Sequence, residues 1–300
     1  MRRLALPLLA LALAVSGPAS AAPLPVSHHF LQDAVMYGAL PSPPGANQWN
    51  CRPSAKHPTP VVLVHGTAGS AGGNWGSMSA SLKNNGYCVY ALTYGLAPEL
   101  AGLPLPIGGM DRMQESAKQL AAFVTKVRRA TGAARVDLVG HSQGTLMPTY
   151  YAKFLGGAKF IRRYVSLSPL WHGTGGGDTT QGSPATINGV SREDLTPVCK
   201  ACPQMASGSA FLAKVRQGGV AVRGIAYTNI VSKWDEIVIP YTSGIERGMK
   251  NIVLQTVCAK DYSDHVQIPA SPTTIDLVLN ALDPAHPRTP RCQLVLPLNG

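Results

Sequence analysis

The amino-acid sequence predicts an α/β fold in which a mostly parallel sheet is covered by helices on both faces. Short apolar, β-branched runs alternate along the chain with segments whose apolar residues recur at helical spacing. The runs are apolar throughout rather than at every second residue, as expected of strands that are buried on both faces. One of them leads directly into a glycine-flanked serine and then into a helix-compatible segment. This order of elements is typical of a parallel sheet with crossover helices.

Residues 1–21 have the pattern of a secretory signal peptide. Arg2 and Arg3 precede an apolar run at residues 4–15, and small residues at 19–21 provide a cleavage site. The run is shorter than the roughly 20 residues that a membrane-spanning helix needs, and an uncleaved anchor is the alternative. We therefore expect a protein that is secreted to the extracellular space.

The composition suits a single domain at residues 22–300. Hydrophobic residues make up 45% of the chain, which is ample for one core. The net charge is +11, but the basic residues are scattered and form no nucleic-acid-binding run, so we expect no nucleic-acid partner. A basic exported surface favours anionic membranes, cell walls or acidic polymers. Residues 22–58, rich in Pro and Ser, are expected to form an extended arm around the domain.

Six cysteines in an exported chain predict three disulfides rather than a metal site. Six cysteines allow 15 pairings, and the sequence does not choose among them. Two of the cysteines are separated by only two residues, and a local disulfide is favoured there because no second pair stands at zinc-ribbon spacing. The six are Cys51, Cys88, Cys199, Cys202, Cys258 and Cys292.

The predicted core opens with a β-branched strand at residues 61–64, which ends in a glycine-bearing loop at 65–70. Glycines in such a loop allow the backbone to approach a substrate closely. A helix is predicted at 74–85, a strand at 87–92 and a longer helix at 113–131, from the spacing of their apolar residues.

The next apolar run, residues 136–139, leads into Gly140-His141-Ser142-Gln143-Gly144. G-x-S-x-G is the nucleophile-elbow pattern, in which a serine lies on a sharp, strained turn between strand and helix. Side chains at the two glycine positions would collide with neighbouring elements. The helix that follows directs free N–H groups and its positive end towards a developing oxyanion. Because the pattern also occurs by chance, the rest of the chain must supply a histidine, an acid and an oxyanion donor.

Two later strands are predicted at residues 160–168 and 220–230. The long segment between them, 171–217, is rich in Gly, Ser and Thr and contains the closely spaced cysteine pair. A connection of this length inside a compact domain is usually functional or disordered, and we regard it as a candidate cap over the site.

In the elbow fold the acid and then the histidine follow the serine along the chain. Only His172, His265 and His286 follow Ser142. His172 precedes most of the acids, and His286 lies in a Pro-rich tail. His265 lies in a polar loop after an apolar run at 252–257, where a catalytic base is expected.

Asp235 stands just beyond a predicted strand, where a carboxylate can accept the imidazole N–H and hold its tautomer. Glu236, Asp261 and Asp264 are the alternatives. Because neighbouring side chains on a turn point apart, we expect only one of Asp235 and Glu236 to face the histidine, and we favour Asp235.

Five motifs in order resemble those of the secreted bacterial class 2 lipases of the α/β-hydrolase superfamily. They are Val64-His65-Gly66-Thr67, Gly86-Tyr87-Cys88-Val89-Tyr90 with Tyr94-Gly95, the Gly-His-Ser-Gln-Gly elbow, Trp234-Asp235-Glu236-Ile237-Val238 with Pro240-Tyr241-Thr242-Ser243, and Asp264-His265-Val266. The resemblance covers roughly residues 45–295. One departure is Thr145, at a position that is often glycine in the family.

The resemblance implies an α/β-hydrolase fold, in which Ser142, Asp235 and His265 form the catalytic triad. It implies that the backbone N–H groups of Thr67 and Gln143 form the oxyanion hole. It also favours the disulfide pairings Cys51 with Cys88, Cys199 with Cys202 and Cys258 with Cys292.

The expected activity is hydrolysis of water-insoluble carboxylic esters, through an acyl-enzyme and without metal or organic cofactor. Polyester or cutin-type hydrolysis and acyl transfer are alternatives with the same triad, and a catalytically silent surface-binding protein is an alternative of another class. We expect a monomer that can adsorb to lipid surfaces and has no obligate protein partner. Eight apolar residues beside the expected triad are candidates for an acyl groove: Leu146, Met147, Leu170, Trp171, Ile237, Val238, Val266 and Ile268. The alternative is that half of them belong to the hydrophobic core.

Overall fold

The computed structural model describes residues 22–175, 186–187, 190–191, 197–298 and 300. The predicted signal peptide and the middle of the candidate cap lie outside the described residues.

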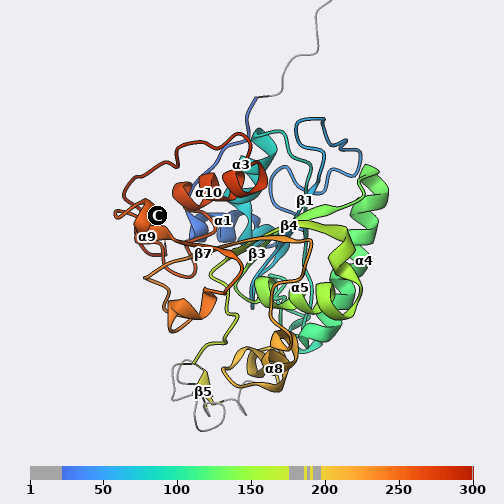
Figure 1. Ribbon diagram of the computed structural model, residues 1–300, viewed down its shortest axis with the longest axis vertical. Coiled ribbons are helices and arrows are strands. Elements are labelled where there is room, and N and C mark those ends of the chain that lie inside the picture. The colour runs from blue at the N-terminus through green and yellow to red at the C-terminus, as the bar shows by residue number, and fades with distance from the viewer. Residues whose placement is uncertain (1–21, 176–185, 188–189, 192–196, 299) are drawn as a thin grey trace, which may run out of the picture.

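A six-stranded parallel sheet forms the centre of the molecule (Figure 1). Its strand order is β2-β1-β3-β4-β7-β8, and every neighbouring pair is parallel. The strand that carries the elbow, β3, therefore lies near the middle of the sheet. The strands are β1 Val61–Val64, β2 Val89–Leu92, β3 Val136–His141, β4 Ile161–Leu167, β7 Ala226–Val231 and β8 Lys250–Val253, and a separate antiparallel pair consists of β5 Thr186–Ile187 and β6 Val190–Ser191.

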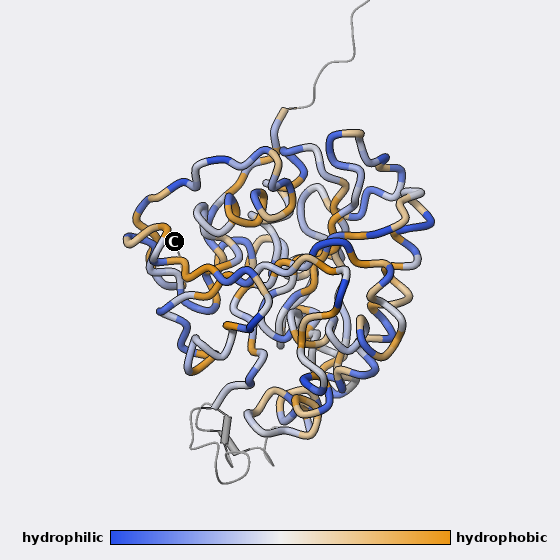
Figure 2. Tube along the Cα trace, in the orientation of Figure 1, coloured by the Kyte–Doolittle hydropathy of each residue, from blue (hydrophilic) through white to orange (hydrophobic). Residues whose placement is uncertain are grey.

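Helices cover both faces of this sheet, and the strands are apolar throughout because each face has its own core. On β1, Val62 and Val64 belong to the cluster that contains residues of α4 and α5, whereas Val61 and Leu63 belong to the cluster that contains residues of α3 and α10. Hydrophobic residues run through the strands at the centre of the trace (Figure 2). The longer helices are α1 Phe30–Tyr37, α3 Gly76–Asn84, α4 Met113–Thr131, α5 Gln143–Phe154 and α10 Pro272–Leu282. The short ones are α2 Ala71–Asn74, η1 Pro98–Leu100, η2 Gly157–Phe160, α7 Cys202–Met205, α8 Ala210–Arg216, η3 Tyr241–Gly244 and α9 Leu254–Val257.

Three predicted elements differ from the structure. The strand expected at residues 220–230 begins only at Ala226, because Gly224 adopts φ +90°, which strand residues do not. The apolar run at 252–257 is divided between β8 and α9. The helix expected at 74–85 is broken at Trp75, which is non-helical and separates α2 from α3.

The N-terminal arm, expected to be extended, contains the helix α1. Buried Asp33 on this helix accepts hydrogen bonds from the backbone N–H and the hydroxyl of Ser77, at 2.7 and 2.6 Å. Gly76 is needed at this contact, since a Cβ there would lie 2.4 Å from the Asp33 carboxyl carbon. The arm is thus anchored to the start of α3 by a buried carboxylate.

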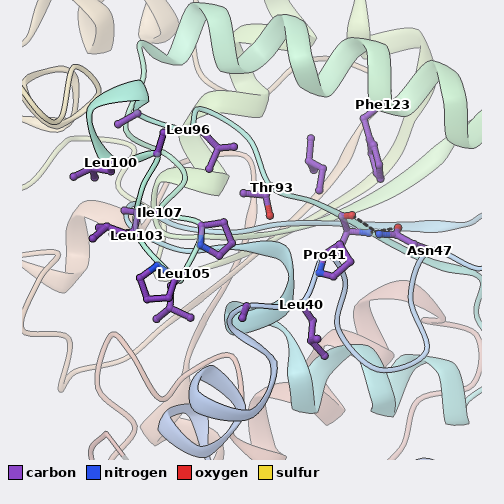
Figure 3. Close-up of a pocket in the computed structure, with 17 residues that line it drawn as sticks. Leu40, Pro41, Asn47, Thr93, Leu96, Leu100, Leu103, Leu105, Ile107 and Phe123 are labelled. Atoms are coloured by element: carbon purple, nitrogen blue, oxygen red, sulfur yellow. Dashed lines mark hydrogen bonds between the residues drawn. The ribbon is translucent and has the colours of Figure 1, made fainter.

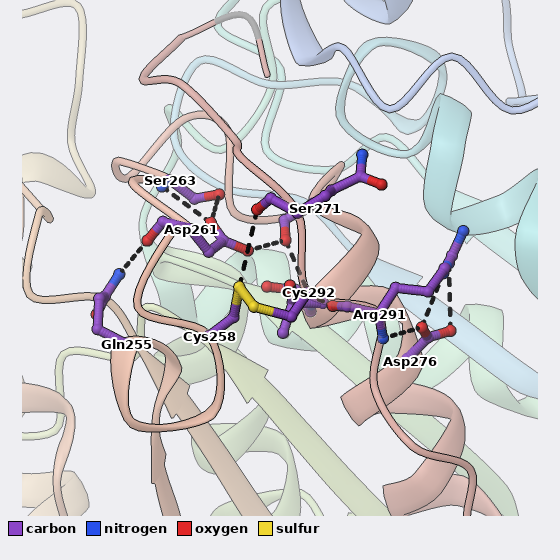
Figure 4. Close-up of a disulfide and its surroundings, with 11 residues drawn as sticks. Gln255, Cys258, Asp261, Ser263, Ser271, Asp276, Arg291 and Cys292 are labelled. Atoms are coloured by element: carbon purple, nitrogen blue, oxygen red, sulfur yellow. Dashed lines mark hydrogen bonds and ion pairs between the residues drawn. A yellow bond between two sulfur atoms is a disulfide. The ribbon is translucent and has the colours of Figure 1, made fainter.

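The structure contains three disulfides, and they are the pairs that the family resemblance implies. Cys51–Cys88 ties the N-terminal arm to the residue before β2, and Cys258–Cys292 ties the loop after α9 to the C-terminal tail. Figure 4 shows the latter beside the polar groups of the loop that follows Cys258. Closing loops of 37 and 34 residues stabilises the fold by about 4 kcal/mol each on the chain-entropy model.

Among the described helices, none has the length and apolar character needed to cross a membrane.

Candidate active site

Ser142 occupies the sharp turn between β3 and α5, with φ +55° and ψ −126°. Positive φ is unfavourable for a residue with a side chain, so the turn is strained at the serine itself. The two flanking glycines are required sterically. A Cβ on Gly140 would lie 2.2 Å from the carbonyl oxygen of Gly144, and a Cβ on Gly144 would lie 2.1 Å from that of Val64. The structure thus has the backbone of a nucleophile elbow.

Thr145, the departure from the family pattern, contributes to this turn. Its hydroxyl donates a 2.7 Å hydrogen bond to the carbonyl oxygen of Ser142, and the hydroxyl of Tyr164 donates to the carbonyl of Thr145 itself. The first of these contacts uses the threonine hydroxyl, so a glycine at this position would not make it.

His265 and Asp235 are hydrogen-bonded and buried together at the carboxyl side of the sheet. Nδ1 of His265 lies 2.9 and 3.0 Å from the two carboxylate oxygens of Asp235. The carboxylate also accepts the backbone N–H groups of Ile237 and Val238, at 3.1 and 2.7 Å. Burial raises the pKa of Asp235, but its interactions with His265 and its other hydrogen bonds outweigh this and hold the pKa below its ordinary value. An ionised Asp235 accepts a hydrogen bond from Nδ1–H of His265, which keeps the imidazole proton on Nδ1 and leaves Nε2 free to act as a base.

The elbow and His265 are joined through His141, the residue that precedes the serine. The rings of His141 and His265 lie 4.9 Å apart between centroids, and Nε2 of His141 lies 2.9 Å from the backbone oxygen of His265. Within the described residues no hydrogen bond joins the Ser142 hydroxyl to His265. Such catalytic bonds commonly tighten only in the substrate complex.

The expectation that only one of Asp235 and Glu236 faces the histidine is wrong. Oε2 of Glu236 accepts the backbone N–H of His265 at 3.0 Å, while Asp235 binds the ring. The two side chains do point apart, but His265 presents its ring to one and its main chain to the other. This contact has no signal in the sequence, because it uses the main chain of the histidine rather than its ring.

The other acids and histidines considered have different partners. Asp261 accepts hydrogen bonds from Ser263 and Ser271, which hold the loop before His265 (Figure 4). Asp264 accepts the backbone N–H groups of Gln267 and Leu298. His172 faces Glu246 at 3.3 Å and His286 faces Asp283 at 3.1 Å.

The predicted oxyanion loop lies against the elbow. The hydroxyl of Thr67 donates to Oε1 of Gln143 at 2.8 Å, and a Cβ on Gly66 would lie 3.0 Å from Cβ of Ser142. Gln143 is the first residue of α5, where backbone N–H groups have no acceptor within the helix. The structure thus brings Thr67, Ser142 and Gln143 together, and the oxyanion-hole role of the two N–H groups remains a prediction.

The described C-terminal part of the candidate cap packs on this loop. Sδ of Met205 lies 3.6 Å from the Thr67 hydroxyl, and Oε1 of Gln204 accepts the backbone N–H of Met113 at 2.8 Å. These contacts place α7 beside the oxyanion loop, and a cap function remains a prediction.

Two buried histidines that the sequence analysis did not single out stabilise the site. Nδ1 of His65 donates to the carbonyl of Gly66 at 2.7 Å, and its ring stacks on Tyr94 at 4.3 Å. Burial lowers the pKa of His65 to about 4 and that of His141 to about 3, so both are neutral at pH 7. The signal was present in the sequence, because both residues lie within the family motifs.

These two histidines predict a loss of stability in acid. Each has its ordinary pKa of 6.5 in the unfolded chain, so between pH 6.5 and 4 the unfolded chain binds more protons than the folded one. The free energy of unfolding, measured by denaturant titration, should therefore decrease as the pH is lowered, by about 1.4 kcal/mol per pH unit for each histidine. His141→Gln should remove one of these contributions, and an unchanged pH slope in that variant would contradict the assignment.

Six of the eight residues proposed for an acyl groove are buried in the cores: Leu146, Met147, Leu170, Trp171, Val238 and Ile268. Each of them follows a proposed triad residue or a strand in the sequence, but its side chain faces the protein interior and exposes almost no surface. Ile237 and Val266 are half-buried, and they remain the residues for which we predict substrate contact.

A large apolar hollow of about 830 Å³ lies elsewhere, at the carboxyl end of β2. Leucines of the loop after β2 and of the N-terminal arm surround it, together with Asn47, which pairs with the backbone of Ala91 (Figure 3). None of the three predicted triad residues lines it. Size alone therefore does not identify the reactive site in this chain.

Across the described residues, no group of three or more His, Cys, Asp and Glu side chains is arranged to bind a metal ion.

Residues 58–277 match the family described as Lipase (class 2). Two curated relatives, triacylglycerol lipases of Pseudarthrobacter phenanthrenivorans and Burkholderia plantarii, are each 37% identical over 98 residues, which is 31% of this chain. The alignments span only 28% and 25% of those relatives.

Solved structures agree on the fold. Lipase B of Aspergillus fumigatus has a TM-score of 0.61 at 21% identity, over 83% of this chain and 56% of that one. The mature lipase BlEst2 of Bacillus licheniformis has a TM-score of 0.52 at 16% identity, over 77% and 94%. With its parallel sheet and elbow, the protein has the α/β-hydrolase fold, and the chain belongs to the class 2 lipase family.

Proposed function

We propose that this protein is a secreted serine ester hydrolase that cleaves carboxylic esters of lipids through an acyl-enzyme on Ser142. The observation that supports it most is the buried Asp235–His265 pair beside a strained serine turn. The triacylglycerol lipase relatives and the family membership support a lipid ester as substrate. The three disulfides are compatible with an extracellular location.

In the first half-reaction, Nε2 of His265 accepts the Ser142 proton as Oγ bonds to the ester carbonyl carbon. The N–H groups of Thr67 and Gln143 stabilise the negative oxygen of the tetrahedral intermediate. When the intermediate collapses, the carbon–oxygen bond to the alcohol breaks, and His265 donates its proton to the departing alkoxide. Water then attacks the acyl-enzyme by the same proton transfers, which release the acid and restore the serine.

The test is an activity profile of the pure protein on p-nitrophenyl esters from acetate to palmitate. We expect hydrolysis that depends on Ser142 and that favours medium or long acyl chains, because Ile237 and Val266 offer apolar surface beside the triad. No hydrolysis of any chain length, with Ser142→Ala indistinguishable from wild type, would refute the proposal and favour a silent surface-binding protein. Product analysis with an added alcohol distinguishes hydrolysis from acyl transfer, and a polyester film tests cutin-type activity.

We also propose that the protein adsorbs to lipid surfaces as a monomer, through an apolar face next to the His265 loop. Trp234 and Tyr262 are 51% and 37% exposed, and their ring centroids lie 5.4 Å apart. The C-terminal tail pairs with this loop through its backbone, and presents Leu294 and Leu296, which are 58% and 51% exposed. Exposed aromatic rings with neighbouring apolar side chains are typical of membrane-interface contacts.

The variant Leu294→Ser/Leu296→Ser tests this face. We expect activity on emulsified triacylglycerol to fall several-fold, about fivefold or more, while activity on soluble p-nitrophenyl butyrate stays unchanged, since apolar area buried at the interface is lost. Val35→Ser, at an exposed apolar position on α1, is the control. Equal losses in both variants, or no loss in either, would argue against this surface.

A further inference from the structure

The main chain of His265 is held on both sides of the residue. Its backbone N–H donates to Oε2 of Glu236 at 3.0 Å, and its backbone oxygen lies 2.9 Å from Nε2 of His141. Its ring is bound separately by Asp235. Three side chains from two segments of the chain therefore bind this one residue.

The two backbone partners have a distinctive place in the chain. Glu236 directly follows Asp235, and His141 directly precedes Ser142. Each contact therefore ties the backbone of the histidine to a residue covalently bonded to another member of the proposed triad. A shift of the His265 loop away from either partner would require the loss of one of these hydrogen bonds.

The ring contact with Asp235 cannot supply this constraint alone. A ring held only through Nδ1 can pivot about that bond whenever its own backbone moves, and Nε2 is the atom that would swing. Displacements near 1 Å at a reacting group cost about a hundredfold in rate. Positions of the backbone N–H and carbonyl together determine where Cα of the histidine lies, and so where Nε2 points.

Each ring nitrogen of His141 faces an oxygen atom. Nε2 lies 2.9 Å from the carbonyl oxygen of His265, and Nδ1 lies 3.0 Å from Oδ1 of Asn74. Burial keeps this ring neutral, so it carries a single proton, and we assign that proton to Nε2, where it is donated to His265. Oδ1 of Asn74 accepts the backbone N–H of Gly66 at 3.3 Å, which places Asn74 between His141 and the loop before Thr67.

We propose that Glu236 and His141 are positioning residues that clamp the main chain of His265 and thereby set Nε2 relative to the Ser142 hydroxyl. The clamp rests on the proposed hydrolase function. Glu236 acts as a hydrogen-bond acceptor rather than as a charge, and His141 acts as a donor. Within the described residues, neither side chain is hydrogen-bonded to the His265 ring or to the Ser142 hydroxyl.

Glu236 is the first test, because its exposed side chain can be changed with little effect on folding. In Glu236→Ala, kcat on a soluble ester at the pH plateau should fall about 10- to 100-fold with KM within about twofold of wild type. Glu236→Gln should stay within about threefold of wild type, because the amide oxygen still accepts the His265 N–H. Glu115→Ala, which removes another exposed, hydrogen-bonded carboxylate on α4, should be unchanged.

Because kcat is compared at the pH plateau, any effect of the lost charge on the protonation of His265 does not enter the comparison. If Glu236→Gln is as impaired as Glu236→Ala, the carboxylate acts through its charge and the clamp is wrong. If Glu236→Ala keeps wild-type kcat, the clamp is equally wrong.

His141 provides the second measurement. His141→Gln places a donor near the position of Nε2, whereas His141→Leu does not, so kcat should be retained largely by Gln and lost about 10- to 100-fold by Leu. The rate of covalent labelling by a fluorophosphonate should fall in parallel, and thermal unfolding of each variant identifies any that fail to fold. Equal kcat in the folded Gln and Leu variants would overturn the role of His141. Wild-type protein without Ser142-dependent hydrolysis would instead refute the proposed function, which separates the two failures.

Discussion

Replacement of Ser142 by alanine is expected to lower kcat by about a millionfold, the cost typical of removing a nucleophile that acts with its base and acid as a unit. The loss should be confined to chemistry. Within the described residues the Ser142 side chain donates no hydrogen bond, and its backbone bonds to Leu167 and Thr145 do not involve the hydroxyl. Alanine at φ +55° is no more strained than serine, so the melting temperature should change little.

The measurement is single-turnover and steady-state hydrolysis of a p-nitrophenyl ester, beside a thermal unfolding curve for the same sample. Thr149→Ala is the control and should keep its activity, because it removes a buried hydroxyl on the same helix that donates to the backbone carbonyl of Thr145. Activity of Ser142→Ala above about one hundredth of wild type would show that another group carries the acyl chain.

Replacement of Asp235 by asparagine should lower kcat by about 10,000-fold with the fold intact. Asparagine is isosteric, but it can present an N–H to Nδ1 of His265, which then places the imidazole proton on Nε2. A protonated Nε2 cannot take the proton of Ser142. The variant therefore tests the tautomer that the 2.9 and 3.0 Å contacts imply, rather than the presence of the histidine.

Asp283→Asn is the matched control for this variant, because Asp283 also faces a histidine, His286, at 3.1 Å on the surface. It should keep wild-type activity. If Asp235→Asn stays within about tenfold of wild type, another carboxylate orients His265 and the proposed triad is wrong in its acid.

Local spacing made the elbow predictable, and the order of acid and histidine along the chain selected the residues of the proposed triad. The glycines around Ser142 carry a steric requirement that is visible in the sequence, and the structure shows the collisions they avoid. The strand that precedes Asp235 and the loop that contains His265 were also recognisable as such. The pairing of distant strands brings Asp235 and His265 into contact. The order of acid before histidine along the chain was enough to select both residues.

Features that depend on which side of the backbone a side chain lies were not predictable. Leu146 follows the proposed nucleophile and Trp171 follows β4, yet both are buried in the core. The two backbone contacts of His265 depend on tertiary placement, since Glu236 and His141 lie 29 and 124 residues away from it. The late start of β7 depends on the positive φ of Gly224, a conformation that glycine permits but does not require.

The most direct test is to label the purified protein with a fluorophosphonate and to map the modified peptide by mass spectrometry. We expect a single adduct, on Ser142. It should form much more slowly in Asp235→Asn, and it should be absent from Ser142→Ala. An active protein whose adduct maps to another residue, or one that hydrolyses esters without forming any adduct, would contradict it.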